Sequence, residues 1–104
     1  MNPRSRATEA AVSKPVTVDL PENLTIANAE ALYNELDAHS SGSQDVILNA
    51  QEVARADTAG LQLLYLFQQT LQQHQASVLW QSPSTALLEA SEQLGMKHHL
   101  GLAA

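Results

Sequence analysis

Cysteine is absent from all 104 residues of the chain. Its absence excludes a disulfide framework, a thiol nucleophile and a zinc site built on thiolates. Aromatic side chains are also few, with one Trp, two Tyr and one Phe, so a core has to be built mainly from Leu, Val, Ile and Ala. The length of the chain suits one such core and therefore one domain.

Long hydrophobic runs are lacking as well. The basic residues Arg4 and Arg6 are not followed by an apolar stretch long enough for a signal peptide, and no later stretch has the length of a membrane span. We therefore expect a cytoplasmic protein without direct membrane insertion. Residues 1–14 have no hydrophobic period and are interpreted as a flexible tail or a partial edge strand, which places the domain at 15–104.

Basic residues become scarce after the start of the chain. Three of the five Lys and Arg precede residue 15, whereas only one of the eleven Asp and Glu does, which leaves Arg55 and Lys97 against ten carboxylates. An acidic body repels nucleic-acid phosphates and anionic lipid surfaces. Nucleic acid is therefore not expected as a partner, and a protein whose contact surface carries basic residues is favoured.

Hydrophobic spacing predicts strands that alternate with helices. Apolar and polar side chains alternate at 16–20, as in a half-buried strand, whereas 46–48 and 78–80 are continuous apolar runs typical of strands covered on both faces. Helical spacing occurs at 28–39 and, over the longest stretch, at 58–74. This alternation indicates α/β units, and the segment 46–81 has the length for a strand, a crossover helix and a parallel strand. The predicted architecture is one small sheet with helices packed against it.

A last helix is predicted to begin at Ser82 and Pro83 and to end at Gly95. Serine is a preferred N-cap, proline suits the first helical position, and glycine adopts the left-handed backbone that closes many helices. The inner face of this helix is predicted to consist of Leu87, Leu88, Ser91 and Leu94.

Functional side chains of an open α/β sheet tend to follow the carboxyl ends of strands. In this sequence that place is the turn Asp57-Thr58-Ala59-Gly60, where the longest predicted helix begins. Free backbone N–H groups and the positive end of the helix dipole would stabilise a carboxylate or a phosphoryl group there. Helix capping by Asp57 or Thr58 is the alternative interpretation of the same residues.

Catalysis and metal binding have little support in the sequence. No two histidines stand at the helical i, i+4 spacing of a metal-ligand pair. No serine lies in a nucleophile-elbow pattern, and there is no glycine-rich phosphate loop. The acidic pair Glu89 and Glu92 has the spacing of a solvated helix face. We therefore expect a non-enzymatic protein that uses neither a metal nor another cofactor.

Residues 46–50 (VILNA) and 56–64 (ADTAGLQLL) resemble the central signature of STAS domains, the family named for sulfate transporters and anti-sigma-factor antagonists. The resemblance extends over residues 15–102, and the order and spacing of its motifs are its most specific features. It implies an α/β fold with a small mixed β-sheet flanked by α-helices, and a function in binding other proteins.

The resemblance also implies a phosphorylation site. In the anti-sigma antagonists, a serine kinase that is also the anti-sigma factor phosphorylates the hydroxyl that follows the Asp of the turn. That position is Thr58 here, so Thr58 is the implied phosphoacceptor, and the turn 57–60 together with Asn23 and Thr25 is the implied contact with the partner. A phosphate on Thr58 would add about −1.5 to −2 charges beside Asp57 and disrupt the complex.

The chain departs from the antagonists upstream of its first predicted helix. They usually carry Gly-Glu-Leu-Asp there, whereas this chain has Glu22-Asn23-Leu24-Thr25 and lacks the second acid. Single-domain STAS proteins similar to this one also occur as subunits of the bacterial phospholipid ABC transporter, bound to its ATPase, and in chemotaxis and histidine-kinase systems. The alternative prediction is therefore an adaptor without phosphorylation. The partner would be an anti-sigma factor with kinase activity under the first hypothesis, and a transporter ATPase or a chemotaxis component under the second.

Overall fold

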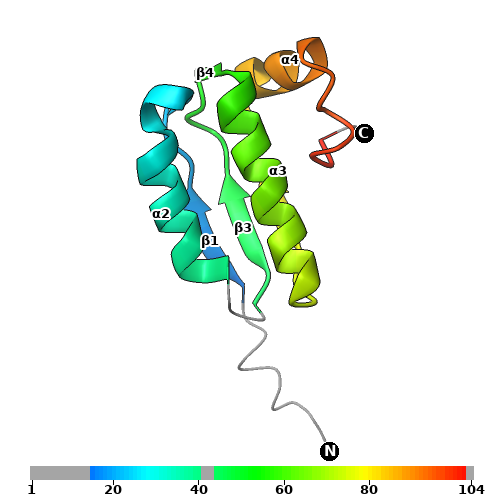
Figure 1. Ribbon diagram of the computed structural model, residues 1–104. Helices are drawn as coiled ribbons and strands as arrows, with labels where there is room; N and C mark the ends of the chain where they lie inside the picture. Colours follow the sequence, from blue (N-terminus) through cyan, green and yellow to red (C-terminus); the bar gives the residue numbers. More distant parts are fainter. Residues whose placement is uncertain (1–14, 41–43, 103–104) are drawn as a thin grey trace, which may run out of the picture.

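The computed structural model describes residues 15–40 and 44–102, so the predicted tail at residues 1–14 lies outside the described residues. Strands and helices alternate along the chain as the spacing predicts (Figure 1). In order they are β1 (Val16–Asp19), β2 (Asn23–Leu24), the 3-10 helix η1 (Ile26–Asn28), α2 (Ala29–Ser40), β3 (Val46–Asn49), β4 (Arg55–Ala56), α3 (Thr58–Gln73), β5 (Val78–Gln81) and α4 (Thr85–Gln93).

Among the described residues, the main sheet has three strands in the order β1–β3–β5. Helix α2 connects β1 to β3, helix α3 connects β3 to β5, and both strand pairs are parallel. Strands β2 and β4 form a second, two-stranded parallel sheet. The α/β class with flanking helices is therefore confirmed. Every strand pairing within 15–40 and 44–102 is parallel, so no antiparallel strand of the implied mixed sheet lies among the described residues.

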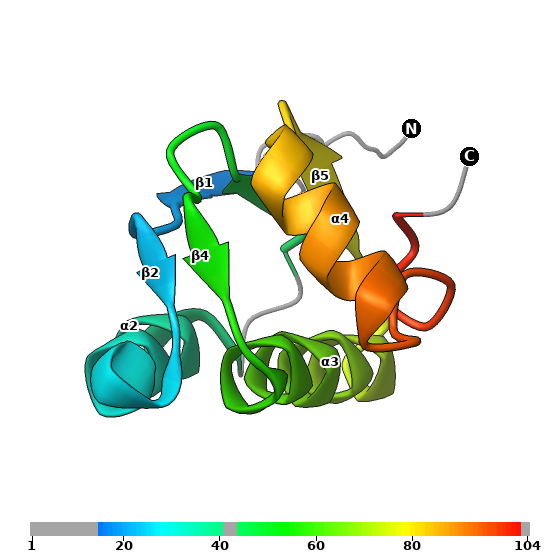
Figure 2. The ribbon, with the colours of Figure 1, turned by 90° about the horizontal axis from the view of Figure 1, so that it is seen from above.

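Both long helices lie on the same face of the main sheet (Figure 2). Side chains of Val18 and Leu48 point toward these helices and are buried. On the other face, which we call the open sheet face, the register aligns Thr17, Ile47 and Leu79. Ile47 is only half-buried and Leu79 is 45% exposed. The prediction that 46–48 and 78–80 are covered on both faces is wrong, because both crossover helices pack on one side.

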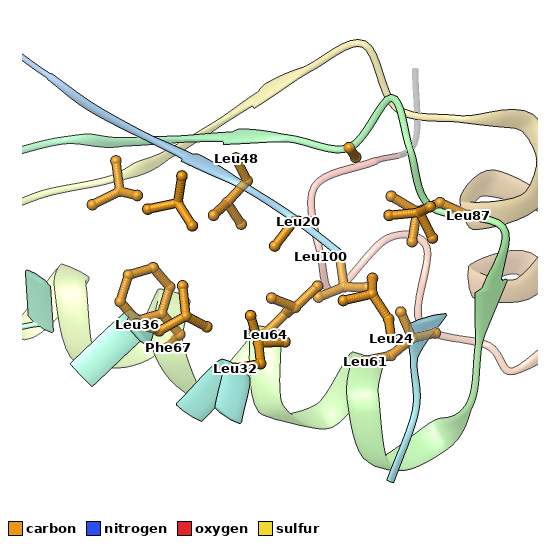
Figure 3. Packing of buried hydrophobic residues seen from close by; sticks show 14 of the residues in the cluster. Leu20, Leu24, Leu32, Leu36, Leu48, Leu61, Leu64, Phe67, Leu87 and Leu100 are labelled. Carbon is orange, nitrogen blue, oxygen red and sulfur yellow. The ribbon is translucent and has the colours of Figure 1, made fainter. Parts of the chain in front are cut away.

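The core lies between this sheet and the two long helices (Figure 3). In α3, the buried side chains Leu61, Leu64, Phe67 and Leu71 recur every three or four residues. That spacing places them on one face of the helix, which is the face that meets the sheet. The same figure shows Leu48 of β3 opposite these side chains.

The last helix begins two residues later than predicted. Its N-cap is Ser84, whose Oγ accepts a hydrogen bond from the Leu87 N–H at 3.1 Å and donates one to the Val53 carbonyl at 2.7 Å. Ser82, the predicted N-cap, instead has a left-handed backbone with a φ of 51°. The prediction is wrong because the bond to Val53, a contact between distant parts of the chain, favours the second of the two serines.

The inner face of α4 is largely as predicted. Leu87 and Ser91 are fully buried, and Leu88 packs against the core. Gly95 has a φ of 72° and follows the C-cap, as predicted for a glycine that closes a helix. Leu94 does not belong to the inner face, since it is itself the C-cap and is 42% exposed.

We expect Ser84→Ala to lower the free energy of unfolding by about 1–2 kcal/mol, because the variant loses the helix cap and leaves the Val53 carbonyl without its donor. Ser82→Gly serves as the control. Glycine adopts a positive φ without strain, so this variant is expected to be up to about 1 kcal/mol more stable than the wild type. Chemical denaturation measures both effects. A greater loss of stability from Ser82→Gly than from Ser84→Ala would contradict the position of the cap.

Candidate partner-binding site

One carboxylate holds the turn before α3. Asp57 is the N-cap of this helix, and its Oδ1 accepts a hydrogen bond from the Gly60 N–H at 2.9 Å. Its Oδ2 accepts a second hydrogen bond, at 3.0 Å, from the N–H of Ile26, which lies 31 residues upstream in η1. The capping interpretation is therefore confirmed for Asp57. One oxygen binds the start of α3 and the other binds η1, so the carboxylate fixes the two elements relative to each other.

These two hydrogen bonds also lower the pKa of Asp57. The Gly60 N–H has the largest effect and the Ile26 N–H the next largest, while desolvation acts in the opposite direction. Hydrogen bonds to the charged form favour that form. A carboxyl group with a lowered pKa in the folded state stabilises the fold above its unfolded pKa, and this stabilisation is lost as the pH falls through the folded pKa.

We expect Asp57→Asn to lower the melting temperature at neutral pH, because an amide has a single acceptor oxygen for the two N–H groups. The difference from the wild type should shrink as the pH falls below the ordinary aspartate pKa of about 3.9 and then through the lowered pKa. Thermal denaturation at a series of pH values measures it. Glu89→Gln, on an exposed position of α4, controls for the change in net charge. A difference that stays constant down to the acid limit would contradict the role of the charged carboxylate.

Gly60 allows α3 to approach β2 closely. A Cβ atom at this position would lie 2.0 Å from the carbonyl oxygen of Leu24 and 2.5 Å from its carbonyl carbon. The same Leu24 oxygen accepts a hydrogen bond from the Asp57 N–H at 3.0 Å. Only glycine therefore fits the third position of the helix without a displacement of β2.

The structure brings the predicted contact residues together at one end of the molecule. Strand β2 pairs with β4 so that Asn23 lies beside Arg55, and the two strands lead into the region of α2 and α3 (Figure 2). Asn23, Thr25, Asp57 and Ala59 are half-buried, Gly60 is buried, and Thr58 is exposed. Thr58 is therefore the side chain of this group that is most available to a partner.

Several apolar residues of this region were missed by the sequence-based prediction. Ile26 is 70% exposed, Leu66 58% and Tyr33 53%. The last two belong to an apolar groove between α2 and α3, which we call the α2/α3 groove. Its lining consists of Tyr33, Leu36, Asp37, Leu63, Leu66, Phe67 and Thr70. The sequence does carry a signal for this surface. Residues 63–67 are all large and apolar, whereas a helix that buries one face in the core needs only some of them.

A family model described as "Mlab, STAS domain" matches residues 7–102 of the chain. The chain belongs to the STAS domain family. A crystal structure of a sulfate transporter family protein from Wolinella succinogenes resembles this STAS domain with a TM-score of 0.68 and 22% identity, over 84% of this chain and 71% of that chain. At this identity the likeness establishes the fold. No curated protein matches the sequence.

The remaining titratable side chains of the described residues do not form a metal centre. Across 15–40 and 44–102 there is no group of three or more His, Asp and Glu residues that would hold a metal ion. The His99 ring meets the Tyr65 ring edge-on, with the ring centroids 5.8 Å apart. Among the same residues of this STAS domain, no helix is long and apolar enough to cross a membrane. The site thus offers an exposed hydroxyl, a helix N-terminus and an apolar groove, which suit contact with another molecule.

Proposed function

We propose that this STAS domain is a cytoplasmic, non-catalytic regulatory module that binds a partner protein through the start of α3 and is switched by phosphorylation of Thr58. The observation that carries the proposal is the exposed position of Thr58 on a turn that Asp57 and Gly60 hold in one geometry. A preorganised contact loses little conformational freedom on binding, which favours affinity.

The charge of the domain supports a protein partner with basic contact residues. From residue 15 onward there are ten carboxylates against Arg55 and Lys97. Lys97 lies 4.0 Å from Glu92, and Arg55 is exposed in β4. Electrostatic complementarity of this kind increases the association rate and suppresses wrong partners.

A phosphate on Thr58 would change this surface at its centre. It adds about −1.5 to −2 charges beside the carboxylate of Asp57. A partner that packs closely on the turn would have to remove water from both charged groups, and removing water from charges without ideal pairing is unfavourable. The basic residues of the partner are proposed to face the surrounding carboxylates and not the turn itself, so phosphorylation of Thr58 is expected to release the partner.

We expect Thr58→Glu to weaken partner binding about tenfold or more, because it places a permanent charge at the centre of the contact, whereas Thr58→Ala should bind but not be modified. Thr85→Glu is the matched control, since Thr85 is also exposed and also the first residue of a helix. The measurement is quantitative mass spectrometry of proteins captured by each variant from the cells that make this chain, together with a search for phosphothreonine in the wild type. An equal loss of partner with both Glu variants, or no loss with Thr58→Glu, would contradict the switch.

A second candidate function, an adaptor that needs no phosphorylation, is favoured by Thr25. The antagonist-type relatives carry an acid at the corresponding position, whereas this half-buried threonine has no charge to offer a kinase. The partner would then be a transporter ATPase or a chemotaxis component. Its recovery with Thr58 unmodified would favour the adaptor. Recovery of an anti-sigma factor with a kinase-like ATP-binding fold, together with phosphate on Thr58, would favour the switch.

A further inference from the structure

The α2/α3 groove exposes apolar surface beyond the proposed contact at the turn. Leu36 and Phe67 are almost completely buried and form its floor, while Tyr33 and Leu66 are more than half exposed and form its walls. The two helices lie side by side in front of the sheet (Figure 1). Adjoining large apolar side chains that remain exposed are typical of a surface that binds another molecule.

The shape of this groove suits a third helix. Side chains of a helix form ridges that pack between those of neighbouring helices. An amphipathic helix presents its anchors at i, i+3, i+4 and i+7, and such a row fits an apolar groove. A helix also satisfies its own backbone hydrogen bonds, so it brings no unpaired N–H or C=O group onto the apolar walls.

The charges around the α2/α3 groove indicate which charge the bound molecule should carry. Helix α3 has no charged residue over its 16 residues. On α2, Glu30 and Asp37 stand three and four residues from Tyr33, a spacing that places all three on one side of the helix. The rim of the groove is therefore acidic, and it is complementary to Lys and Arg side chains.

The turn lies N-terminal to the groove on α3. Thr58, Gln62 and Leu66 are all exposed and recur every four residues. With a rise of about 1.5 Å per residue, Thr58 and Leu66 lie about 12 Å apart along the helix. A helix of four or five turns in the groove would therefore extend along α3 as far as the level of Thr58, which lies about 80° around the helix from Leu66.

We infer that the α2/α3 groove binds a basic amphipathic helix of the partner protein, with apolar side chains against Leu66 and Tyr33 and with Lys or Arg beside the acidic residues of α2. This inference rests on the protein-binding function proposed above and does not depend on modification of Thr58. It assigns to the partner a helix with an apolar stripe and a positively charged polar face.

Two other occupants fit less well. A second copy of the chain would bring the same acidic rim against itself, and like charges repel. The segment 1–14 contains Arg4, Arg6 and Lys14, but its apolar residues are Ala, one Val and Met1. Such a segment has no row of large side chains to fill the groove.

Two synthetic peptides of about 18 residues, or five helical turns, test the inference. Both carry the same leucine stripe, one with Lys and Arg on its polar face and the other with Glu. In NMR titrations of the full-length ¹⁵N-labelled chain, the basic peptide should shift the amide signals of residues that line the groove, and its affinity should fall as salt is added. Leu66→Gln should weaken binding about tenfold or more. Leu79→Gln, at an exposed leucine of the open sheet face, should leave the affinity unchanged.

Equal binding of the two peptides, shifts on the open sheet face alone, or an unchanged affinity of Leu66→Gln would overturn the inference. If the amide signals of groove residues shift when the protein is diluted without peptide, the groove binds a second copy of the chain. Signals that move when residues 1–14 are removed would assign it to the chain's own segment. Each of these results also overturns the inference. If the peptide binds through Leu66 and the cellular partner binds Thr58→Glu as well as it binds the wild type, the inference about the groove is supported and the proposed phosphorylation switch is rejected.

Discussion

Gly60→Ala is expected to lower the free energy of unfolding of this STAS domain by about 3 kcal/mol, the upper part of the usual range for an overpacked site. Alanine is otherwise favoured over glycine inside a helix by up to about 1 kcal/mol. Here the added Cβ would lie 2.0 Å from the Leu24 carbonyl oxygen, whereas real Cβ atoms keep at least 3.0 Å from such a neighbour, so backbone has to move by about 1 Å. The steric effect therefore exceeds the gain in helix propensity.

The displacement in Gly60→Ala should also reach the turn that is proposed to bind the partner. Leu24 is fully buried in β2, and its carbonyl accepts the N–H of Asp57. If β2 moves away from α3, that hydrogen bond weakens and the carboxylate of Asp57 loses its position between Gly60 and Ile26. We therefore expect the variant to bind the partner less well even under conditions in which it remains folded.

Gly95→Ala is the matched control for the Gly60 variant. Gly95 has a positive φ, and a Cβ added to it would meet no heavy atom within 4 Å, so only the strain of a left-handed alanine, about 1–2 kcal/mol, is expected. Urea denaturation of both variants gives the comparison. A loss from Gly60→Ala no larger than that from Gly95→Ala would contradict the close approach of α3 to β2.

The long elements were predictable because their signals are local. The period of residues 58–74 predicts a helix, and the structure has α3 at Thr58–Gln73. Asp57 is the N-cap and accepts a hydrogen bond from the residue three positions later, so the signal for the start of this helix lies in neighbouring residues. The two-residue strands β2 and β4 were not predicted, because two residues cannot show a period.

The errors concern contacts between distant parts of the chain. Ser82 and Ser84 are equivalent as isolated N-cap candidates, and the carbonyl of Val53, 31 residues away, decides between them. The burial of Leu79 was overestimated because a hydrophobic run does not reveal on which side of a sheet the crossover helices pack. These are tertiary effects that override local preference.

The position of the candidate site was predictable from the sequence, but the roles of its individual residues were not. The resemblance to the family placed the turn at residues 57–60, and the structure separates Asp57 and Gly60, which hold the turn, from the exposed Thr58. The bond from Ile26 to Asp57 spans 31 residues and has no signature in the sequence. The width of the apolar stripe at 63–67 indicates that some of its large residues lie outside the core, but the exposure of Leu66 in particular depends on how α2 packs against α3.

Leu64→Ala is expected to lower the free energy of unfolding by about 3 kcal/mol, since removing a buried leucine side chain usually has an effect of about 2–5 kcal/mol. Leu64 has no exposed surface and packs in the core between α3 and the sheet. Domains of this size are stable by only about 5–15 kcal/mol. The melting temperature should therefore fall by roughly 15 °C.

Leu66→Ala is the matched control for Leu64→Ala, two residues further along the same helix. Leu66 is 58% exposed, so its replacement should change the stability by no more than about 0.5 kcal/mol. The two variants should then separate stability from binding, because Leu64 supports the core and Leu66 forms a wall of the α2/α3 groove. Thermal denaturation and titration with the basic peptide measure the two properties independently. If Leu66→Ala destabilised the domain as much as Leu64→Ala, then Leu66 would belong to the core, and the groove would not be the surface proposed to receive a partner helix.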